Sequence, residues 1–85
     1  MLGELTDRDR AILAIETAWP RHSGTKEELI RAQLGMSAAR YYQLLGRLIE
    51  SEAALEYDPL LVGRLRRLRD ARASRRRART PGFAG

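Results

Sequence analysis

The segment EELIRAQLGMSAARYYQLLG, residues 27–46, contains the clearest structural pattern in the sequence. Its pattern is that of a helix-turn-helix, in which a short helix, the turn LGMS at residues 34–37 and a second helix follow one another. Gly35 stands where a helix ends in the left-handed conformation, which glycine adopts at little cost because it has no Cβ. The apolar residues on either side of it fill the angle between the helices, and Ser37 is the expected N-cap of the second helix. The departure is Arg31, where compact motifs usually have alanine, and a plain three-helix bundle with a glycine turn is the alternative.

Capping residues and helix breakers place the first two helices. Thr6, with an acidic residue three positions later, predicts a capping box at the start of a helix over residues 6–19, which Pro20 ends. We interpret Trp19 as the core anchor of this helix rather than as an exposed stacking surface. Thr25, with a glutamate three positions later, predicts another capping box, so the second helix is expected to begin there.

The last helix is predicted after a connector over residues 52–58, which has one helical turn at 53–55. Asp58 is the expected cap. Pro59 suits the first helical position, because a backbone N–H there would have no partner within the helix. The apolar stripe of this helix consists of Leu61, Leu65 and Leu68. Beyond Leu68 the chain has good helix formers but nothing to bury, so we expect it to fray or to be disordered.

Together these elements predict an all-α fold. A three-helix helix-turn-helix core is followed by a fourth, C-terminal helix that runs into an arginine-rich, partly disordered arm. The helical domain is expected over residues 1–68, and the basic arm with its tail over residues 69–85.

The charge is divided unevenly along the chain. Residues 1–60 carry seven Arg and Lys against ten Asp and Glu, a net of −3, whereas residues 61–85 carry nine Arg against one Asp, a net of +8. The two values add up to the net charge of +5. A cationic arm on a mildly acidic body indicates a polyanionic partner, most often nucleic acid. A solubilising tail, or one that contacts an acidic protein surface, is the alternative.

The third helix, residues 37–51, can face the core in two phases. One phase buries Tyr41, Leu44, Leu45 and Leu48, and the other buries Ala38, Tyr42, Leu45 and Ile49. Both phases leave Arg40, Gln43 and Arg47 outside, on one stripe at i, i+3 and i+7. Arginine can bind guanine bidentately and glutamine can pair with adenine, so this stripe suits base recognition in a major groove. For each residue by itself, an ordinary solvated helix face is the alternative.

The predicted nucleic-acid-binding set joins this helix to the arm. Its N-terminus at Ser37 would approach a phosphate, and the arginines of the arm would contact phosphates or a minor groove. The set consists of Ser37, Ala39, Arg40, Tyr42, Gln43, Arg47, Arg64, Arg67, Arg69, Arg72, Arg75, Arg76, Arg77 and Arg79.

The inventory of reactive groups argues against an enzyme. There is no cysteine, and the single histidine, His22, is expected in a surface loop, so no metal site and no cofactor are predicted. Glu27 and Glu28 are adjacent and diverge on a helix, and neither a GxGxxG nor a Walker pattern occurs. The N-terminus lacks the features of a signal peptide, and the apolar run at residues 11–15 is far too short to span a bilayer. We therefore expect no membrane contact and a cytoplasmic, nucleoid location.

The chain also resembles a known family. The blocks MSAARYYQLL (residues 36–45), AL (54–55), DPLLV (58–62) and RLRRLR (64–69) look like a family of small proteins of unknown function from high-GC Gram-positive bacteria, the actinobacteria. Within them RYYQ and DPLLV are the specific parts, and the resemblance covers about residues 6–72. It implies a helical, helix-turn-helix-like protein and a regulator, but no established activity.

The leading hypothesis is a DNA-binding protein, a transcriptional regulator or nucleoid-associated factor, with the third helix in the major groove and the arm on phosphates. So small an interface binds weakly, which leads us to expect a homodimer or a larger complex. The alternative is an adaptor that binds RNA polymerase or another transcription component through the Tyr and Leu face of the last two helices. The acidic body favours the adaptor because it repels a phosphate backbone. A third hypothesis is association with RNA or the ribosome through the arm alone.

Overall fold

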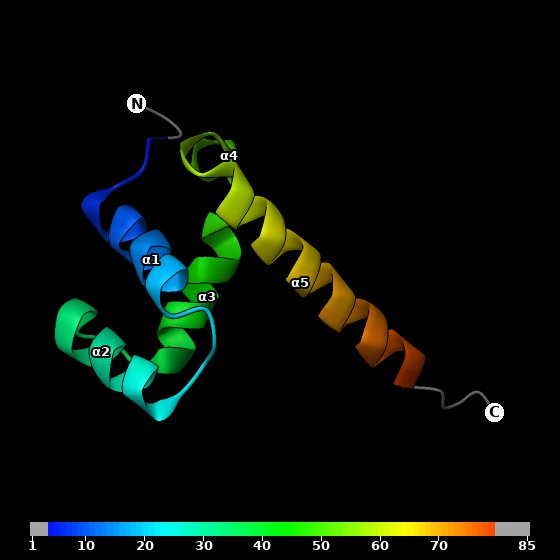
Figure 1. The fold of residues 1–85 in the computed structure, drawn as a ribbon, viewed down its shortest axis with the longest axis horizontal. Helices are drawn as coiled ribbons and strands as arrows, with labels where there is room; N and C mark the ends of the chain where they lie inside the picture. Colours follow the sequence, from blue (N-terminus) through cyan, green and yellow to red (C-terminus); the bar gives the residue numbers. More distant parts are fainter. Residues whose placement is uncertain (1–3, 80–85) are drawn as a thin grey trace.

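The fold is all-α. The computed structural model describes residues 4–79, and within this range there are helices but no β-strand. The helices are α1 (Asp7–Ala18), α2 (Gly24–Leu34), α3 (Ala38–Leu48), α4 (Glu52–Tyr57) and α5 (Pro59–Arg79). Figure 1 shows α1 packed beside α3, with α2 across one end of this pair and α5 extending away from the bundle.

The helix starts are set by side-chain caps. Thr6 forms the predicted capping box with Asp9, whose carboxylate accepts from the Thr6 N–H at 3.0 Å. The predicted start of α2 is wrong: Ser23, not Thr25, is the N-cap, and its Oγ accepts from the Lys26 N–H at 3.1 Å. Serine is a better N-cap than threonine, and the earlier start adds residues to the helix. Lys26 lies in the first turn of α2, and its side chain is buried.

The predicted turn between α2 and α3 is confirmed. Gly35 has φ +65° and ψ 29°, and its N–H donates to the Arg31 carbonyl at 2.9 Å. Ser37 caps α3, accepting from the Arg40 N–H at 3.2 Å. Arg31 itself is exposed on the outside of α2, so its departure from the usual alanine requires no change in packing.

The core combines residues from all five helices. It consists of Ile12, Leu13, Ile15, Ile30, Tyr41, Leu45, Leu48, Ile49, Ala54, Leu61 and Val62. The burial of Tyr41 and Leu48 selects the first of the two predicted phases of α3, although Ile49 is buried as well. The prediction that Trp19 anchors the core is wrong, because it is 37% exposed. Trp19 is the C-cap of α1, where the chain has already left the helical conformation, and Tyr41 fills the central position instead.

The C-terminal part differs from its prediction in one respect. The single helical turn expected in the connector is α4, and Asp58 caps α5 as predicted, its carboxylate accepting from the Leu61 N–H at 3.2 Å. The expected disorder after Leu68 is not confirmed, since α5 continues to Arg79. Arginine and alanine are strong helix formers, and extending a helix that is already anchored needs no new nucleation. The predicted tail over residues 80–85 lies outside the described residues.

Candidate nucleic-acid interface

The outward face of α3 carries the stripe predicted to recognise bases. Arg40, Gln43 and Arg47 are all exposed, opposite the face that packs on the body. The Arg40 guanidinium donates to the Gln43 Oε1 at 3.4 Å, which is the long end of the hydrogen-bond range. The neighbouring Ser37 is exposed, but its hydroxyl is used as the cap of α3. A phosphate at this helix end would therefore meet backbone N–H groups rather than the serine side chain.

Two other members of the predicted set on α3 lie elsewhere. Ala39 and Tyr42 line a groove between α3 and α5, away from the outward stripe. Tyr42 is half-buried, its ring is edge-on to that of Tyr41 at 4.9 Å, and its Oη lies 3.0 Å from His22 Nδ1. Since its hydroxyl and ring both contact the protein, Tyr42 helps position the loop before α2.

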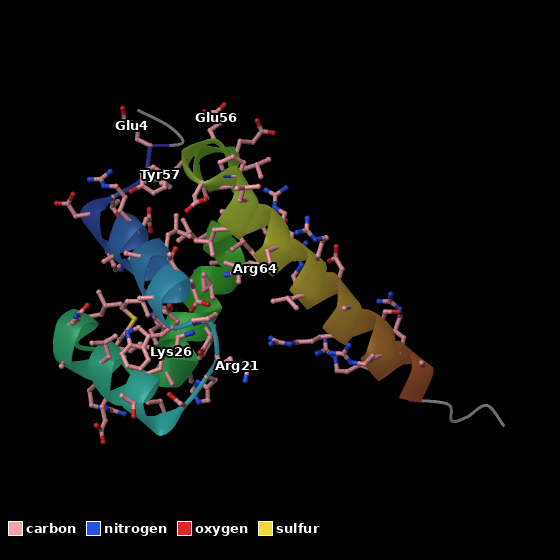
Figure 2. All side chains as sticks on the ribbon, viewed as in Figure 1. Glu4, Arg21, Lys26, Glu56, Tyr57 and Arg64 are labelled. Atoms are coloured by element: carbon pink, nitrogen blue, oxygen red, sulfur yellow. The ribbon has the colours of Figure 1, made fainter. Side chains whose placement is uncertain are left out.

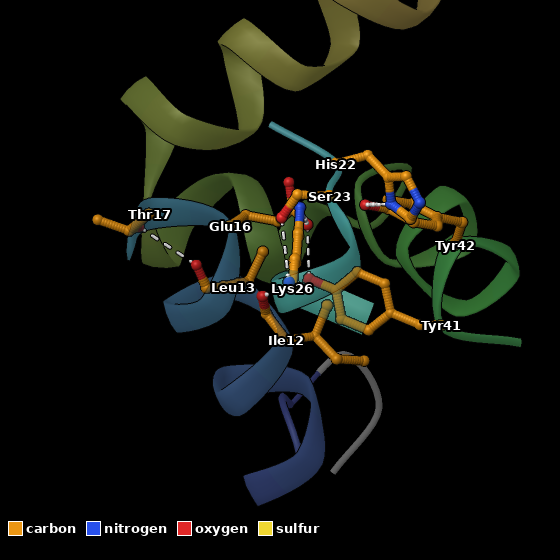
Figure 3. Close-up of polar contacts among 9 residues, drawn as sticks. All are labelled: Ile12, Leu13, Glu16, Thr17, His22, Ser23, Lys26, Tyr41 and Tyr42. Atoms are coloured by element: carbon orange, nitrogen blue, oxygen red, sulfur yellow. Dashed lines mark hydrogen bonds and ion pairs between the residues drawn. The ribbon is translucent and has the colours of Figure 1, made fainter. Parts of the chain in front are cut away.

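A buried polar cluster fixes α3 against α1 and α2 (Figure 3). Lys26 Nζ lies 2.8 Å from Glu16 Oε2, with the two side chains only 1% and 3% exposed. The Tyr41 hydroxyl donates to the same Glu16 oxygen at 2.5 Å and lies 3.3 Å from the Ile12 carbonyl oxygen. Burial, reinforced by the hydrogen bond to Glu16, raises the pKa of Tyr41 well above its ordinary value, so the hydroxyl stays a donor.

Lys26 also lies over the two adjacent tyrosine rings, 5.7 Å from the Tyr41 centroid and 5.3 Å from that of Tyr42. These distances are within the range of cation–π attraction. This cluster was not predicted from the sequence. The signal was present for Glu16, which follows Ile12 by four positions and so falls on the buried face of α1. The orientation of the outward stripe on α3 depends on this cluster, because Tyr41 belongs to the same helix.

Two arginines of α5 hold that helix to the body. The Arg66 Nε donates to the Ile49 carbonyl at 2.6 Å, at the C-terminal end of α3. Arg69 forms ion pairs with Glu50 and with Asp70. Arg69 was predicted to contact phosphate, but its guanidinium is already engaged by carboxylates, whereas Arg66 was not in the predicted set at all.

The remaining predicted arginines of α5 point in different directions (Figure 2). Arg72 and Arg76 line the groove beside α3. Arg64 lies on the side that faces the C-terminal end of α1, near Thr17. The side chains of Arg67, Arg75 and Arg77 are exposed and line neither this groove nor the hollow beside Arg64. Arg79 ends α5, and its side chain lies outside the described part of the structure.

Within residues 4–79, no three His, Cys, Asp or Glu side chains gather as a metal site would require. His22 is exposed in the loop before α2, with Nε2 3.3 Å from the Glu27 Oε2. No described helix combines the length and apolar character needed to cross a bilayer.

The chain belongs to the DUF3263 family, described as proteins of unknown function, whose sequence model matches residues 4–77. This agrees with the resemblance to a family of unknown function noted from the sequence. No curated protein matches the chain, and no solved structure matches it either.

Proposed function

We propose that this member of the DUF3263 family is a DNA-binding protein, a transcriptional regulator or nucleoid-associated factor, with α3 as its recognition helix. One observation carries the proposal: α3 packs on the body with one face and leaves Arg40, Gln43 and Arg47 exposed on the opposite face. A B-DNA major groove is about 12 Å wide and admits one α-helix. The turn at Gly35 and the cap at Ser37 support the same docking mode, in which the second helix of the motif reads the bases.

The chemistry of the stripe suits base edges. An arginine fork can donate to O6 and N7 of guanine, and a glutamine amide matches N6 and N7 of adenine. The hydrogen bond between Arg40 and Gln43 is long and exposed. Exchanging it for a base contact therefore costs little, and both side chains can turn towards DNA.

The exposed arginines of α5 would add contacts to phosphates. Arg67, Arg75 and Arg77 have no role in the core, in contrast to Arg66 and Arg69, which hold α5 to the body. Arginines carried on a helix lose less conformational entropy on binding than arginines on a disordered arm. Because one module offers only a small interface, we propose that the protein binds DNA as a homodimer or together with a partner protein.

The test compares two double variants by fluorescence anisotropy, on a duplex selected from random sequences and on an unselected duplex. Arg40→Ala/Arg47→Ala should weaken binding to the selected duplex by about 1–3 kcal/mol for each arginine that binds a base, and change binding to the unselected one little. The matched control, Arg8→Ala/Arg31→Ala, removes two exposed arginines from α1 and α2 and should leave the preference between duplexes unchanged. An equal loss on both duplexes for the α3 variant, or no binding at micromolar protein and low salt, would overturn the proposal.

A further inference from the structure

The two adjacent tyrosines of α3 lie in different surroundings. Tyr41 is fully buried and its hydroxyl donates to Glu16 Oε2 at 2.5 Å, whereas Tyr42 is half-buried and its hydroxyl lies 3.0 Å from Nδ1 of the exposed His22. Figure 3 shows Tyr41 directed towards Glu16 and Lys26, and Tyr42 directed towards His22. Successive residues of an α-helix are roughly 100° apart around its axis. Exchanging the two tyrosines would therefore require a rotation of α3 about its own axis.

Apolar packing by itself does not decide this rotation. Leu45 is buried in both phases of α3, with Leu44 and Leu48 on one side of it and Ala38 and Ile49 on the other. Leu48 and Ile49 are 7% and 4% exposed, and Leu44 and Ala38 are both half-buried. The apolar surface of α3 is therefore wide, and a rotation towards either edge replaces one set of apolar contacts by another. The phase has to be fixed by polar contacts.

Glu16 supplies the polar contact that distinguishes the two tyrosines. Lys26 does not distinguish them, because its Nζ lies at similar distances from both ring centroids, 5.7 Å for Tyr41 and 5.3 Å for Tyr42. The Glu16 carboxylate accepts from the Tyr41 hydroxyl, while the Tyr42 hydroxyl lies at His22. Lys26 Nζ, 2.8 Å from Glu16 Oε2, holds this carboxylate in place inside the body.

A buried ion pair of this kind contributes little net stability, because the desolvation of its two charges offsets their attraction. The best-attested role of buried polar groups is instead to fix the register of packed helices. The choice of residue also points to a specific fit. Lys26 is the only lysine in the chain, whose other basic side chains apart from the histidine are all arginine. A compact ammonium suits this enclosed position better than the planar guanidinium of arginine.

We propose that the buried pair of Glu16 and Lys26 selects the rotational phase of α3, and that both are positioning residues for DNA recognition. In the other phase Tyr42 would turn to the Glu16 carboxylate. The outward stripe would still be exposed, but it would point in a direction up to roughly 100° away. Hydrogen bonds to base edges need close and well-aligned donors, so only one phase suits a given docking of α3. The consequence for DNA rests on the proposed function, whereas the selection of the phase does not.

Two matched substitutions test the selection of the phase. Tyr41→Phe leaves Tyr42 as the tyrosine of α3 that can donate to Glu16, so the second phase should become populated. The amide peaks of α3 in a proton–nitrogen NMR spectrum should then double or broaden. Tyr42→Phe removes the same hydroxyl from the neighbouring residue and should keep one set of peaks. Ile12→Val, which shortens a buried core side chain, should lower the stability but also keep one set.

A thiol probe reports the direction of the rotation. The chain has no cysteine, so Leu44→Cys introduces a single thiol, at a position that is half-buried in the observed phase and outside in the other. Iodoacetamide should alkylate this thiol several times faster in combination with Tyr41→Phe than with Tyr42→Phe. Glu16→Leu/Lys26→Met removes the pair without leaving a buried charge, and should accelerate alkylation in the same way as Tyr41→Phe.

The preference for the selected over the unselected duplex is the functional readout. It should fall about tenfold or more in Tyr41→Phe, which corresponds to one lost base contact, and stay unchanged in Ile12→Val. A single set of α3 peaks and unchanged alkylation in both Tyr41→Phe and the pair variant would overturn the selection of the phase. Two phases with an unchanged preference would overturn the positioning role. A wild-type chain that binds no DNA would overturn the proposed function, while the NMR and alkylation results would still decide whether the pair selects the phase.

Discussion

The body of the protein and the distal half of α5 are both helical, but different interactions hold them. In the body each helix starts at a side-chain cap, and each contributes buried residues to one core. The caps are Thr6, Ser23, Ser37, Ser51 and Asp58. In the distal half the side chains from 70 to 78 are all exposed except Ala73, which is half-buried. The body is therefore stabilised by packing, whereas the distal half depends on helix propensity and on its continuity with an anchored helix.

This difference indicates which segments of the chain could bind a partner. The buried polar side chains of the body, Glu16 and Lys26, are paired with each other. The distal half of α5 presents arginines on several sides, with Arg69 tied to Glu50 at its base. In α3 residues that determine the fold and residues available for binding lie on opposite faces, whereas along α5 they follow one another. Substitutions in the two regions should have effects of different size and kind.

The largest effect is expected at the buried ion pair. Glu16→Ala leaves the Lys26 ammonium buried without a counter-charge, and it also removes the nearer of the two acceptors of the Tyr41 hydroxyl. Breaking one side of a buried pair costs roughly 3–5 kcal/mol in the free energy of unfolding. Urea denaturation followed by circular dichroism at neutral pH measures this loss.

The control for this prediction replaces both partners. Glu16→Leu/Lys26→Met removes both charges together and should come close to wild-type stability, because an apolar pair of similar volume needs no desolvation of ions. A loss below about 1 kcal/mol for Glu16→Ala would mean that Lys26 reaches water without its partner. The buried cluster of Glu16, Lys26 and Tyr41 would then not determine the orientation of α3.

A smaller effect is expected at the turn. Gly35→Val puts a β-branched residue at φ +65°, which costs about 2–3 kcal/mol. No neighbouring atom lies within 4 Å of the added Cβ, so the loss comes from the backbone conformation alone. Gly35→Asn should lose clearly less, since asparagine tolerates the left-handed conformation. Equal melting temperatures for Val and Gly would contradict the conformation of Gly35.

The sequence predicted features whose cause is local. Gly35, Ser37 and Asp58 act through atoms a few residues away, and Pro59 acts through its own missing N–H, so pattern and spacing were sufficient. The exposure of Arg40, Gln43 and Arg47 was also predictable, because either phase of α3 leaves them outside.

Features that depend on long-range contacts could not be predicted in this way. Glu16 and Lys26 come from different helices, and although Glu16 falls on the buried face of α1, no local pattern indicates that Lys26 is its partner. Trp19 was misplaced because its size indicates burial, while the end of α1 turns it outward. The pairing of Arg69 with Glu50 and the position of Arg72 beside the groove required the direction of α5, which no local signal contains.

The smallest effect on stability is expected from the distal half of α5. Ending the chain after Leu68 removes no core residue, and the ion pair of Arg69 with Glu50 is partly exposed. Exposed pairs contribute about 0–1 kcal/mol, so the truncated body should unfold cooperatively with nearly the wild-type free energy, while its total helical signal falls.

If arginines of α5 bind phosphates, the slope of log affinity against log salt should fall by about 0.9 for each phosphate that is no longer neutralised. A full-length variant with Arg72, Arg75, Arg76 and Arg77 changed to glutamine removes these charges but keeps the helix. It should lower the salt slope while leaving most of the helical signal. A truncation that lowers stability by several kcal/mol would show that the distal half supports the body. An unchanged salt slope in both variants would show that the arginines they remove do not bind phosphates, and DNA binding would then depend on α3 and the arginines before Arg69.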